Sequence, residues 1–330
     1  MKGETANDKM DFTQTTSDSF NHFALATFKN QIAKSTVYQA FCRALGKNDR
    51  EISNWTEIPF LPISFFKTHR VCMEEPIVRV FESSGTGGNR SQHLVNDLSL
   101  YEQSFFPTFK KYIETHLEDV SILALLPSYL ERNNSSLVYM VNALLPEAHE
   151  TSGFFLNDFT ALKNQLEANE KNEVKTLLLG VSFALLDFSE EFAMPLKYTT
   201  IMETGGMKGR REELTRTQLH AQLCQAFQVN EIHSEYGMTE LFSQAYSKGN
   251  GIFVCPPWMK VVCRDIQDPL SLLPAGKRGA LNIIDLANQN SCSFIATEDV
   301  GVVHENGTFE ILGRMNHAEI RGCNLLFSES

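Results

Sequence analysis

Short apolar runs alternate with helix-like stretches through the middle of the chain, and this alternation constrains the fold most. The runs are residues 77–81, 121–126, 175–179, 198–202 and 229–233, and helical patterns include residues 99–117, 135–145 and 211–227. Strands separated by helices are typical of right-handed crossovers, which build a largely parallel sheet covered on both faces. The sequence therefore predicts an α/β body.

The flanking regions have different textures. Residues 20–45 carry apolar side chains at helical spacing and end at Gly46, which predicts one amphipathic helix. Residues 58–67 contain two prolines and several aromatic residues, which predicts an extended segment packed on the core. Beyond Gly251, short apolar runs joined by Gly, Pro and Asn predict a small β-rich region. We expect three parts: residues 1–57, 58–250 and 251–330.

Charge and composition exclude several classes of protein. Lys and Arg number 29 against 40 Asp and Glu, a net charge of −11, which argues against a general nucleic-acid binder. No run approaches the roughly 18 apolar residues of a membrane span, and the polar start lacks a secretion signal. Seven scattered cysteines form no C-x-x-C pair, and the histidines show no metal-ligand spacing. We expect a cytoplasmic protein with free thiols.

A loop rich in glycine and hydroxyl groups follows the first apolar run. It contains Ser83, Ser84, Gly85, Thr86, Gly87 and Gly88. Small residues let backbone amides close around an anion, so this composition fits a phosphate site, although a flexible surface turn has the same composition. The loop lacks the G-K-[ST] ending of a Walker loop and the last glycine of G-x-G-x-x-G.

Three later segments carry polar groups that could bind parts of a nucleotide. In residues 234–240, Tyr236 could stack on a base, Thr239 could meet a phosphate and Glu240 could hold Mg²⁺, or the segment is a capped turn. A loop at residues 297–301 contains Asp299, whose carboxylate could accept hydrogen bonds from ribose hydroxyls, or it is a β-turn. In residues 313–323, a buried Arg314 could pair with phosphate or with Asp299.

The order S-S-G-T-G-G, Y-G-M-T-E, T-E-D-V-G, G-R-x-N resembles the motif series of adenylate-forming enzymes, the superfamily of acyl-CoA ligases and luciferases. Within it, the chain is most similar to the LuxE-type acyl-protein synthetases. Residues 58–67, 126–132, 135–140, 203–210 and 321–324 support this resemblance, which runs from about residue 58 to the end.

The resemblance implies a fold and a set of roles. The fold is the N-terminal body of an adenylate-forming enzyme, with mixed, largely parallel sheets and a small β-rich subdomain. The loop from Ser83 to Gly88 would close on the ATP phosphates, and Gly205 and Gly206 would line the adenine and acyl pocket. Tyr236 and Gly237 would flank the adenine, Thr239 would contact the α-phosphate, Glu240 would bind Mg²⁺, Asp299 the ribose and Arg314 the nucleotide.

Three departures from the family pattern are visible. Gly87 gives T-G-G in place of T-T-G, and Asn316 stands at a position where an aspartate hinge is usual. The sequence ends shortly after Gly322, so the expected C-terminal lid and its adenylation lysine have no counterpart, and Lys208 and His233 are lesser candidates to replace that lysine.

The implied activity is ATP-dependent conversion of a fatty acid to acyl-AMP, followed by transfer of the acyl group to a cysteine thiol. Cys323 is the only cysteine near the C-terminus, and the positive charge of Arg321, two positions earlier, would favour the thiolate. A buried core cysteine is the alternative for Cys323. An acyl reductase or another acyl-acceptor protein is the implied partner.

Two other functions remain open at this stage. One is a ligase of the same fold that activates an aryl or short-chain acid for CoA or a carrier protein. The other is a non-catalytic nucleotide-binding or scaffold protein. The 24 phenylalanines suit an apolar acyl tunnel and an ordinary core equally well.

Overall fold

A six-stranded sheet spans residues 121–247, and four of its five strand pairings are parallel. The structure is a computed structural model, and it describes residues 10–73, 75–83, 90–127, 134–205 and 214–315. In spatial order the strands are β5 (Gly153–Phe154), β4 (Ser121–Leu125), β6 (Thr176–Val181), β7 (Thr199–Thr204), β8 (His233–Tyr236) and the antiparallel β9 (Ala245–Ser247). The predicted parallel α/β arrangement is confirmed.

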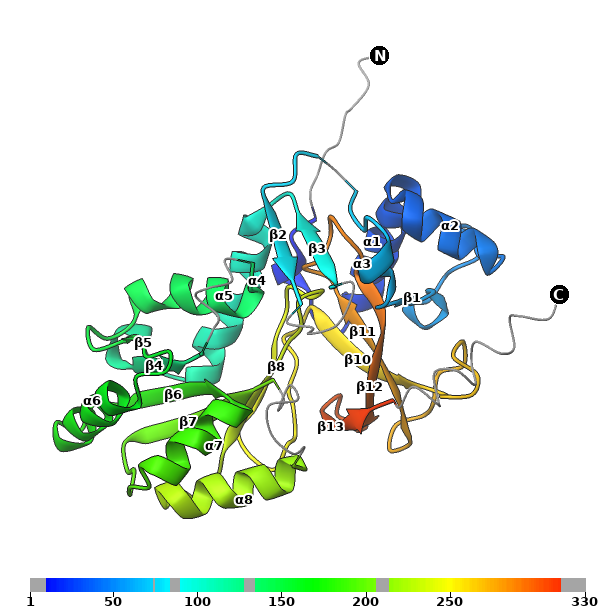
Figure 1. Ribbon diagram of the computed structural model, residues 1–330. Helices are drawn as coiled ribbons and strands as arrows, with labels where there is room; N and C mark the ends of the chain where they lie inside the picture. Colours follow the sequence, from blue (N-terminus) through cyan, green and yellow to red (C-terminus); the bar gives the residue numbers. More distant parts are fainter. Residues whose placement is uncertain (1–9, 74, 84–89, 128–133, 206–213, 316–330) are drawn as a thin grey trace.

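Helices cover both faces of this sheet. The elements α4 (Leu98–Ile113) and α5 (Ser136–Leu144) lie on one side, and α7 (Ser182–Glu191) and α8 (Arg216–Phe227) lie on the other (Figure 1). The remaining helix of this part is α6 (Phe159–Lys171), and short 3₁₀ turns are Leu117–Asp119 and Leu145–Glu147. Covered faces explain why β4 and β6 are buried at every position.

A second sheet is mostly antiparallel. It contains β10 (Met259–Arg264), β11 (Arg278–Asp285), β12 (Phe294–Val303) and β13 (Phe309–Arg314), and β1 (Leu61–Pro62) joins it by parallel pairing with β12. The strand β1 belongs to this sheet although it lies far from it in sequence. The division of the chain at residues 57/58 and 250/251 stays a prediction.

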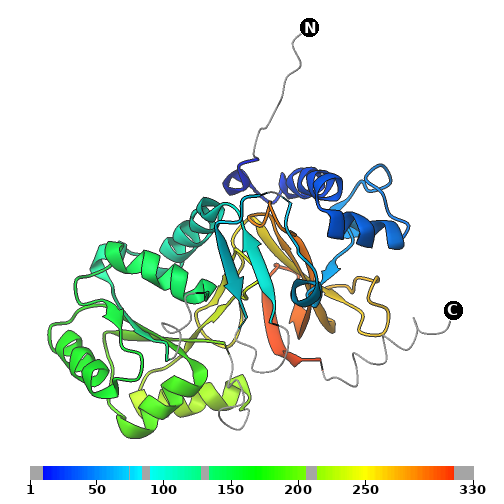
Figure 2. The same cartoon turned by 45° about the horizontal axis from the view of Figure 1, so that its top comes forward.

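A hairpin lies between the two sheets. It consists of β2 (Arg79–Glu82) and β3 (Gln92–Val95), which pair antiparallel (Figure 2). We expected the run at residues 77–81 to be a strand of the parallel sheet, and this was wrong. The connection between the two strands is too short for the crossover that parallel pairing requires.

Four further boundaries differ from the sequence-based expectation. The helix expected over residues 20–45 is broken at Ser35, whose hydroxyl caps a second helix, giving α1 (Phe20–Lys34) and α2 (Thr36–Ala44). The extended segment at residues 58–67 is extended only to Ile63, and α3 (Phe65–Thr68) follows, because a helix can begin after a proline. The run at residues 229–233 enters the sheet only at His233. Short 3₁₀ turns at Phe12–Gln14 and Trp55–Glu57 complete the elements.

The fourth correction concerns residues 297–301, which were expected to form a loop. They lie inside β12, paired with β11 and β13, and a register shift falls between Val300 and Gly301. A side chain on Gly301 would lie 2.1 Å from the Glu310 carbonyl oxygen, so glycine permits this close strand pairing. The expected turn is therefore a strand.

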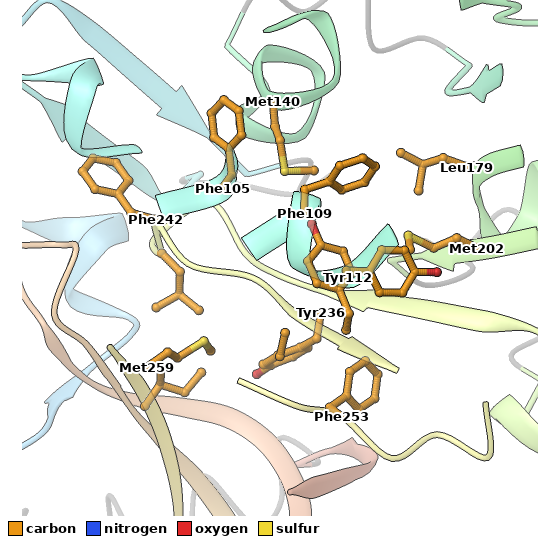
Figure 3. Packing of buried hydrophobic residues seen from close by; sticks show 14 of the residues in the cluster. Phe105, Phe109, Tyr112, Met140, Leu179, Met202, Tyr236, Phe242, Phe253 and Met259 are labelled. Carbon is orange, nitrogen blue, oxygen red and sulfur yellow. The ribbon is translucent and has the colours of Figure 1, made fainter. Parts of the chain in front are cut away.

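One continuous core joins the two sheets. Phe105, Phe109 and Met140 come from the helices, and Leu179 and Met202 come from the parallel sheet (Figure 3). The same cluster continues through Tyr236, Phe242, Phe253 and Met259 toward the second sheet. Because phenylalanines of this cluster are tightly buried, the core accounts for many of the 24 phenylalanines in the sequence.

Candidate active site

The carboxyl ends of β6, β7 and β8 meet at one edge of the parallel sheet. Ser182, directly after β6, donates hydrogen bonds to Glu203 Oε2 at 3.2 Å and to the Gly205 carbonyl oxygen at 3.0 Å. Gly205 has a φ of 69°, a left-handed conformation that glycine adopts readily. Open α/β sheets bind ligands outside the carboxyl ends of their strands, so this edge is the candidate ligand site of the sheet.

Tyr236, Asp299 and Arg314 converge at this edge from β8, β12 and β13. The Tyr236 hydroxyl donates to Asp299 Oδ2 at 2.8 Å, and Arg314 Nε donates to Asp299 Oδ1 at 3.1 Å. Asp299 and Arg314 are also register partners in the second sheet. The expected pairing of Arg314 with Asp299 is confirmed, but the Arg314 side chain is 76% exposed and not buried, because β13 ends there.

The Tyr236 ring is almost fully enclosed. It packs against the rings of Phe253 and Phe309 at centroid distances of 5.9 and 5.5 Å, in edge-to-face geometry. Burial and the negative charge of Asp299 raise the pKa of Tyr236, so its hydroxyl stays protonated and donates. The tyrosine therefore fixes the orientation of the Asp299 carboxylate.

Thr239 and Glu240 follow in the turn after β8. Thr239 is half-buried, and its carbonyl oxygen lies 2.9 Å from Nδ1 of His93. Glu240 is buried, and this burial raises the pKa of its carboxyl, although the Ser91 hydroxyl donates a hydrogen bond that favours the charged form. A buried carboxyl with few protein partners is suited to a cation.

Glu235 is buried beside these residues, and it was not among the site residues predicted from the sequence. Thr204 donates a short hydrogen bond to Glu235 Oε2. Burial raises the pKa of Glu235 to about 7, and the nearby charge of Glu203 acts in the same direction. A side chain at Gly237 would lie 2.4 Å from Glu235 Oε1, so the glycine leaves room for this carboxyl. In the sequence, only the position of Glu235 next to Tyr236 could have indicated that it belongs to the site.

Three polar side chains that the sequence reading missed hold the turn at residues 239–243. His93 and Asn288 contact the carbonyl oxygens of Thr239 and Glu240 at 2.9 and 2.8 Å. Asp285 Oδ2 accepts from the backbone N–H groups of Phe242 and Ser243 at 2.7 and 2.9 Å. The three come from β3, the end of β11 and the turn that follows it, and no spacing in the sequence relates them.

A fourth missed contact connects α8 with the second sheet. Arg216 donates from Nε to Glu203 Oε1 at 3.1 Å and from a terminal nitrogen to the Ile311 carbonyl oxygen at 3.2 Å. The guanidinium also lies 5.0 Å from the centre of the Phe253 ring. Burial opposes ionisation of Glu203, but the His220 hydrogen bond and the charge of Arg216 together lower its pKa.

Several predicted site residues lie outside the described residues: Ser84, Gly85, Thr86, Gly87, Gly88, Gly206 and Cys323, as does Lys208. The two ends of the glycine-rich loop are described. Ser83 N–H donates to the Ser91 carbonyl oxygen at 3.1 Å, and Ser91 N–H donates to Ser83 Oγ at 3.0 Å. These two bonds close the base of the loop.

His233 lies at the opposite end of β8 from Tyr236, about 10 Å away along the strand. It contacts the hydroxyl of Tyr112 there, and it lines a surface cavity of about 680 Å³ at the amino ends of β7 and β8. This position, far from Tyr236, and the contact with Tyr112 favour a hydrogen-bonded structural role for His233, the alternative to its replacing the lid lysine.

The described part of the chain holds no group of three or more His, Cys, Asp or Glu side chains arranged to bind a metal. In the same ranges, every helix is too short or too polar to cross a bilayer.

Comparison with known proteins places these features in a family. Residues 8–330 match the family described as acyl-protein synthetase, LuxE. A long-chain-fatty-acid–luciferin-component ligase of Aliivibrio fischeri is 28% identical over an alignment of 302 positions, which covers 82% of this chain and 77% of that protein.

Solved structures share the fold. ATP-bound MatB of Rhodopseudomonas palustris matches with a TM-score of 0.55 and 18% identity, over 72% of this chain and 48% of that one. The chain thus spans about half the length of that protein. A 2-hydroxyisobutyryl-CoA ligase in complex with 2-HIB-AMP and CoA matches with a TM-score of 0.67 and 9% identity, over 91% and 70% of the two chains. The chain belongs to the LuxE family of acyl-protein synthetases, and it is a ligase with the fold of adenylate-forming enzymes.

Proposed function

We propose that the protein activates a fatty acid with ATP and then holds the acyl group as a thioester on Cys323. In the first step a carboxylate oxygen attacks the α-phosphorus, the bond to the bridging oxygen breaks, and pyrophosphate leaves. In the second step the thiolate attacks the acyl carbon, the bond to the AMP oxygen breaks, and AMP leaves with its electron pair. The thiol proton passes to solvent.

The observation that carries the first step is the convergence of Tyr236, Asp299 and Arg314 at the ligand-binding edge of the sheet. A carboxylate oriented by a tyrosine can accept hydrogen bonds from vicinal ribose hydroxyls. The exposed guanidinium of Arg314 adds a positive charge for phosphate at the same place. The closed base of the glycine-rich loop, at Ser83 and Ser91, supports a phosphate-binding role for residues 83–88.

Mg²⁺ is the proposed cofactor, and the chemistry of the donors fits it. Glu240 would supply a buried carboxylate oxygen, which is a hard oxygen ligand, and Thr239 would contact the α-phosphate beside it. When bound, Mg²⁺ offsets negative charge on the phosphates. Burial raises the pKa of Glu240 and Ser91 acts in the opposite direction, so a bound cation would stabilise the charged carboxylate.

The fatty acid and the partner are proposed from the resemblance. The Aliivibrio fischeri relative is named for a long-chain fatty acid and a luciferin component. An acyl reductase or another acyl-acceptor protein would then receive the acyl group. Cys323 is the proposed donor because it is the one cysteine in the C-terminal segment.

Intact-protein mass spectrometry tests this proposal. The protein is incubated with ATP, Mg²⁺ and a mixture of fatty and aryl acids, and the adduct mass identifies the acid. We expect a fatty-acyl adduct that hydroxylamine removes and that Cys323→Ser lacks, while acid-dependent pyrophosphate release by the variant continues. An aryl adduct would favour the alternative ligase, and ATP binding without pyrophosphate release would favour a non-catalytic protein.

A further inference from the structure

His93 is a buried histidine at the meeting point of three segments. It lies in β3, and its side chain is fully enclosed. Its ring stacks on Phe242 at 4.7 Å, and the edge of Phe66 contacts it at 5.9 Å. The imidazole forms its hydrogen bonds through its two nitrogens, in the ring plane.

Both nitrogens face oxygen atoms that accept hydrogen bonds. Nδ1 lies 2.9 Å from the Thr239 carbonyl oxygen, and Nε2 lies 3.0 Å from Asn288 Oδ1. The orientation of the Asn288 amide is fixed, because its Nδ2 donates to the carbonyl oxygens of Glu240 and Cys292 at 2.8 and 3.0 Å. A neutral imidazole carries one N–H, so it can donate to only one of the two oxygens.

The two tautomers of the neutral His93 ring differ in the segment that they hold. Asn288 is already held through its Nδ2, whereas the bond from His93 to Thr239 is the link between the hairpin and the turn after β8. The tautomer with its proton on Nδ1 donates to the Thr239 carbonyl oxygen, and it is the one that adds a connection between the two segments.

We propose that His93 is a positioning residue that fixes Thr239 and Glu240 relative to the glycine-rich hairpin. This inference rests on the proposed function, because it assigns the geometry of that same site. The hairpin strand that carries His93 begins just after Ser91, which closes the loop at residues 83–91. Holding the Thr239 carbonyl oxygen from β3 fixes the turn that carries the proposed magnesium carboxylate relative to Ser91, at the described base of the hairpin loop.

The turn itself is rigid enough to transmit this constraint. Asn288 holds the Glu240 carbonyl oxygen, and Asp285 holds the N–H groups of Phe242 and Ser243. Asp285 Oδ1 also accepts from the Ser243 hydroxyl at 2.6 Å. Loss of the bond from His93 therefore removes a link between this whole turn, with Thr239 and Glu240, and the hairpin strand β3.

Two amide substitutions separate the nitrogens of His93. Asparagine places its donor near the position of Nδ1, and glutamine places its donor near Nε2. In acid-dependent pyrophosphate release, we expect His93→Phe to lower kcat about 10- to 100-fold, the effect of a small misplacement at a reacting centre. His93→Asn restores kcat to within about threefold of the wild type, and His93→Gln does not.

A matched control removes a buried hydrogen bond elsewhere. Tyr38→Phe deletes the bond from the Tyr38 hydroxyl in α2 to the Pro59 carbonyl oxygen, 2.6 Å long, where the ring stacks on Phe294 of β12. We expect it to lower Tm without changing kcat or the KM for ATP. This comparison separates positioning from a general loss of stability.

The outcomes are distinguishable. Activity of His93→Phe within twofold of the wild type, or equal rescue by asparagine and glutamine, overturns the role of His93 and leaves the proposed function standing. A wild-type protein without acid-dependent pyrophosphate release overturns the proposed function and this inference with it. If His93→Phe does not fold, the asparagine and glutamine pair still decides the question.

Discussion

The hydroxyl of Tyr236 donates a hydrogen bond to Oδ2 of Asp299 at 2.8 Å, and this bond joins the two sheets of the molecule. Tyr236 ends β8 of the parallel sheet, and Asp299 lies within β12 of the other sheet. Both are nearly buried, with 8% and 5% of their surface exposed. The carboxylate is thus held by a side chain from the opposite sheet.

Tyr236→Phe deletes the donor and leaves the Asp299 carboxylate paired with Arg314. We expect the KM for ATP to rise about fivefold, the effect of one lost hydrogen bond, with kcat nearly unchanged. Asp299→Ala removes the proposed ribose ligand and should raise that KM about 10- to 100-fold. Tyr198→Phe, at the amino end of β7, is the control, and steady-state pyrophosphate release is the measurement. An unchanged KM in Asp299→Ala would remove Asp299 from the site.

Gly237→Ala places a methyl group 2.4 Å from Glu235 Oε1 and 3.4 Å from the Gln244 side chain. Glu235 is buried and bonded to Thr204, so it cannot move freely. We expect a loss of about 1–3 kcal/mol in unfolding free energy and lower activity. Gly153→Ala is the matched control, since a side chain there meets nothing within 4 Å. Equal urea unfolding midpoints for the two variants would contradict the expectation.

Glu235 gives the stability a pH dependence of known sign. Burial raises its pKa from 4.5 to about 7, so between these values the folded protein binds a proton that the unfolded chain does not. The contribution of Glu235 to the free energy of unfolding is therefore greatest below pH 4.5. It decreases as the pH rises toward 7, by at most about 3 kcal/mol. Glu235→Gln lacks this titration.

Urea unfolding of the wild type and Glu235→Gln at several pH values measures the effect. The variant should become more stable relative to the wild type as the pH rises from 5 to 8. Taking this difference cancels the titration of other buried carboxyls, such as Asp285 and Glu240. A difference that stays constant with pH would show that Glu235 is ionised in the folded protein at pH 5.

Arg216→Met leaves the Glu203 carboxylate buried without its cation. The Glu203 side chain is 3% exposed and that of Arg216 is 27% exposed, so we expect a loss of about 2–3 kcal/mol in unfolding free energy. Adding Glu203→Gln should recover part of this loss, because the uncompensated charge is then gone. A double-mutant cycle by urea unfolding measures the coupling. Strictly additive effects would mean that the ion pair contributes nothing.

The alternation of apolar runs predicted the parallel sheet because β4, β6 and β7 are buried on both faces. It failed at residues 77–81, where the same local pattern belongs to a hairpin. A strand's partner depends on the connection that follows, and a short apolar run carries no information about that.

The motifs predicted Tyr236, Asp299 and Arg314, and the structure brings these three together. His93, Asp285 and Asn288 could not be predicted, since they act on the main chain of a distant turn. A side chain that bonds to a backbone group places no requirement on the residue type that carries this group, so the contact leaves no pattern in the sequence.

The strand β1 has a consequence for how the chain is made. Its only partner in the described residues is β12, and the nearby Gln31 side chain accepts a hydrogen bond from the N–H of Ser293, 262 positions later. The ribosome must therefore translate most of the message before the N-terminal helices can pack in their final position on the second sheet. Until then the aromatic side chains of these helices stay exposed to solvent. In a nascent chain of this protein, we expect this exposed segment to bind a chaperone.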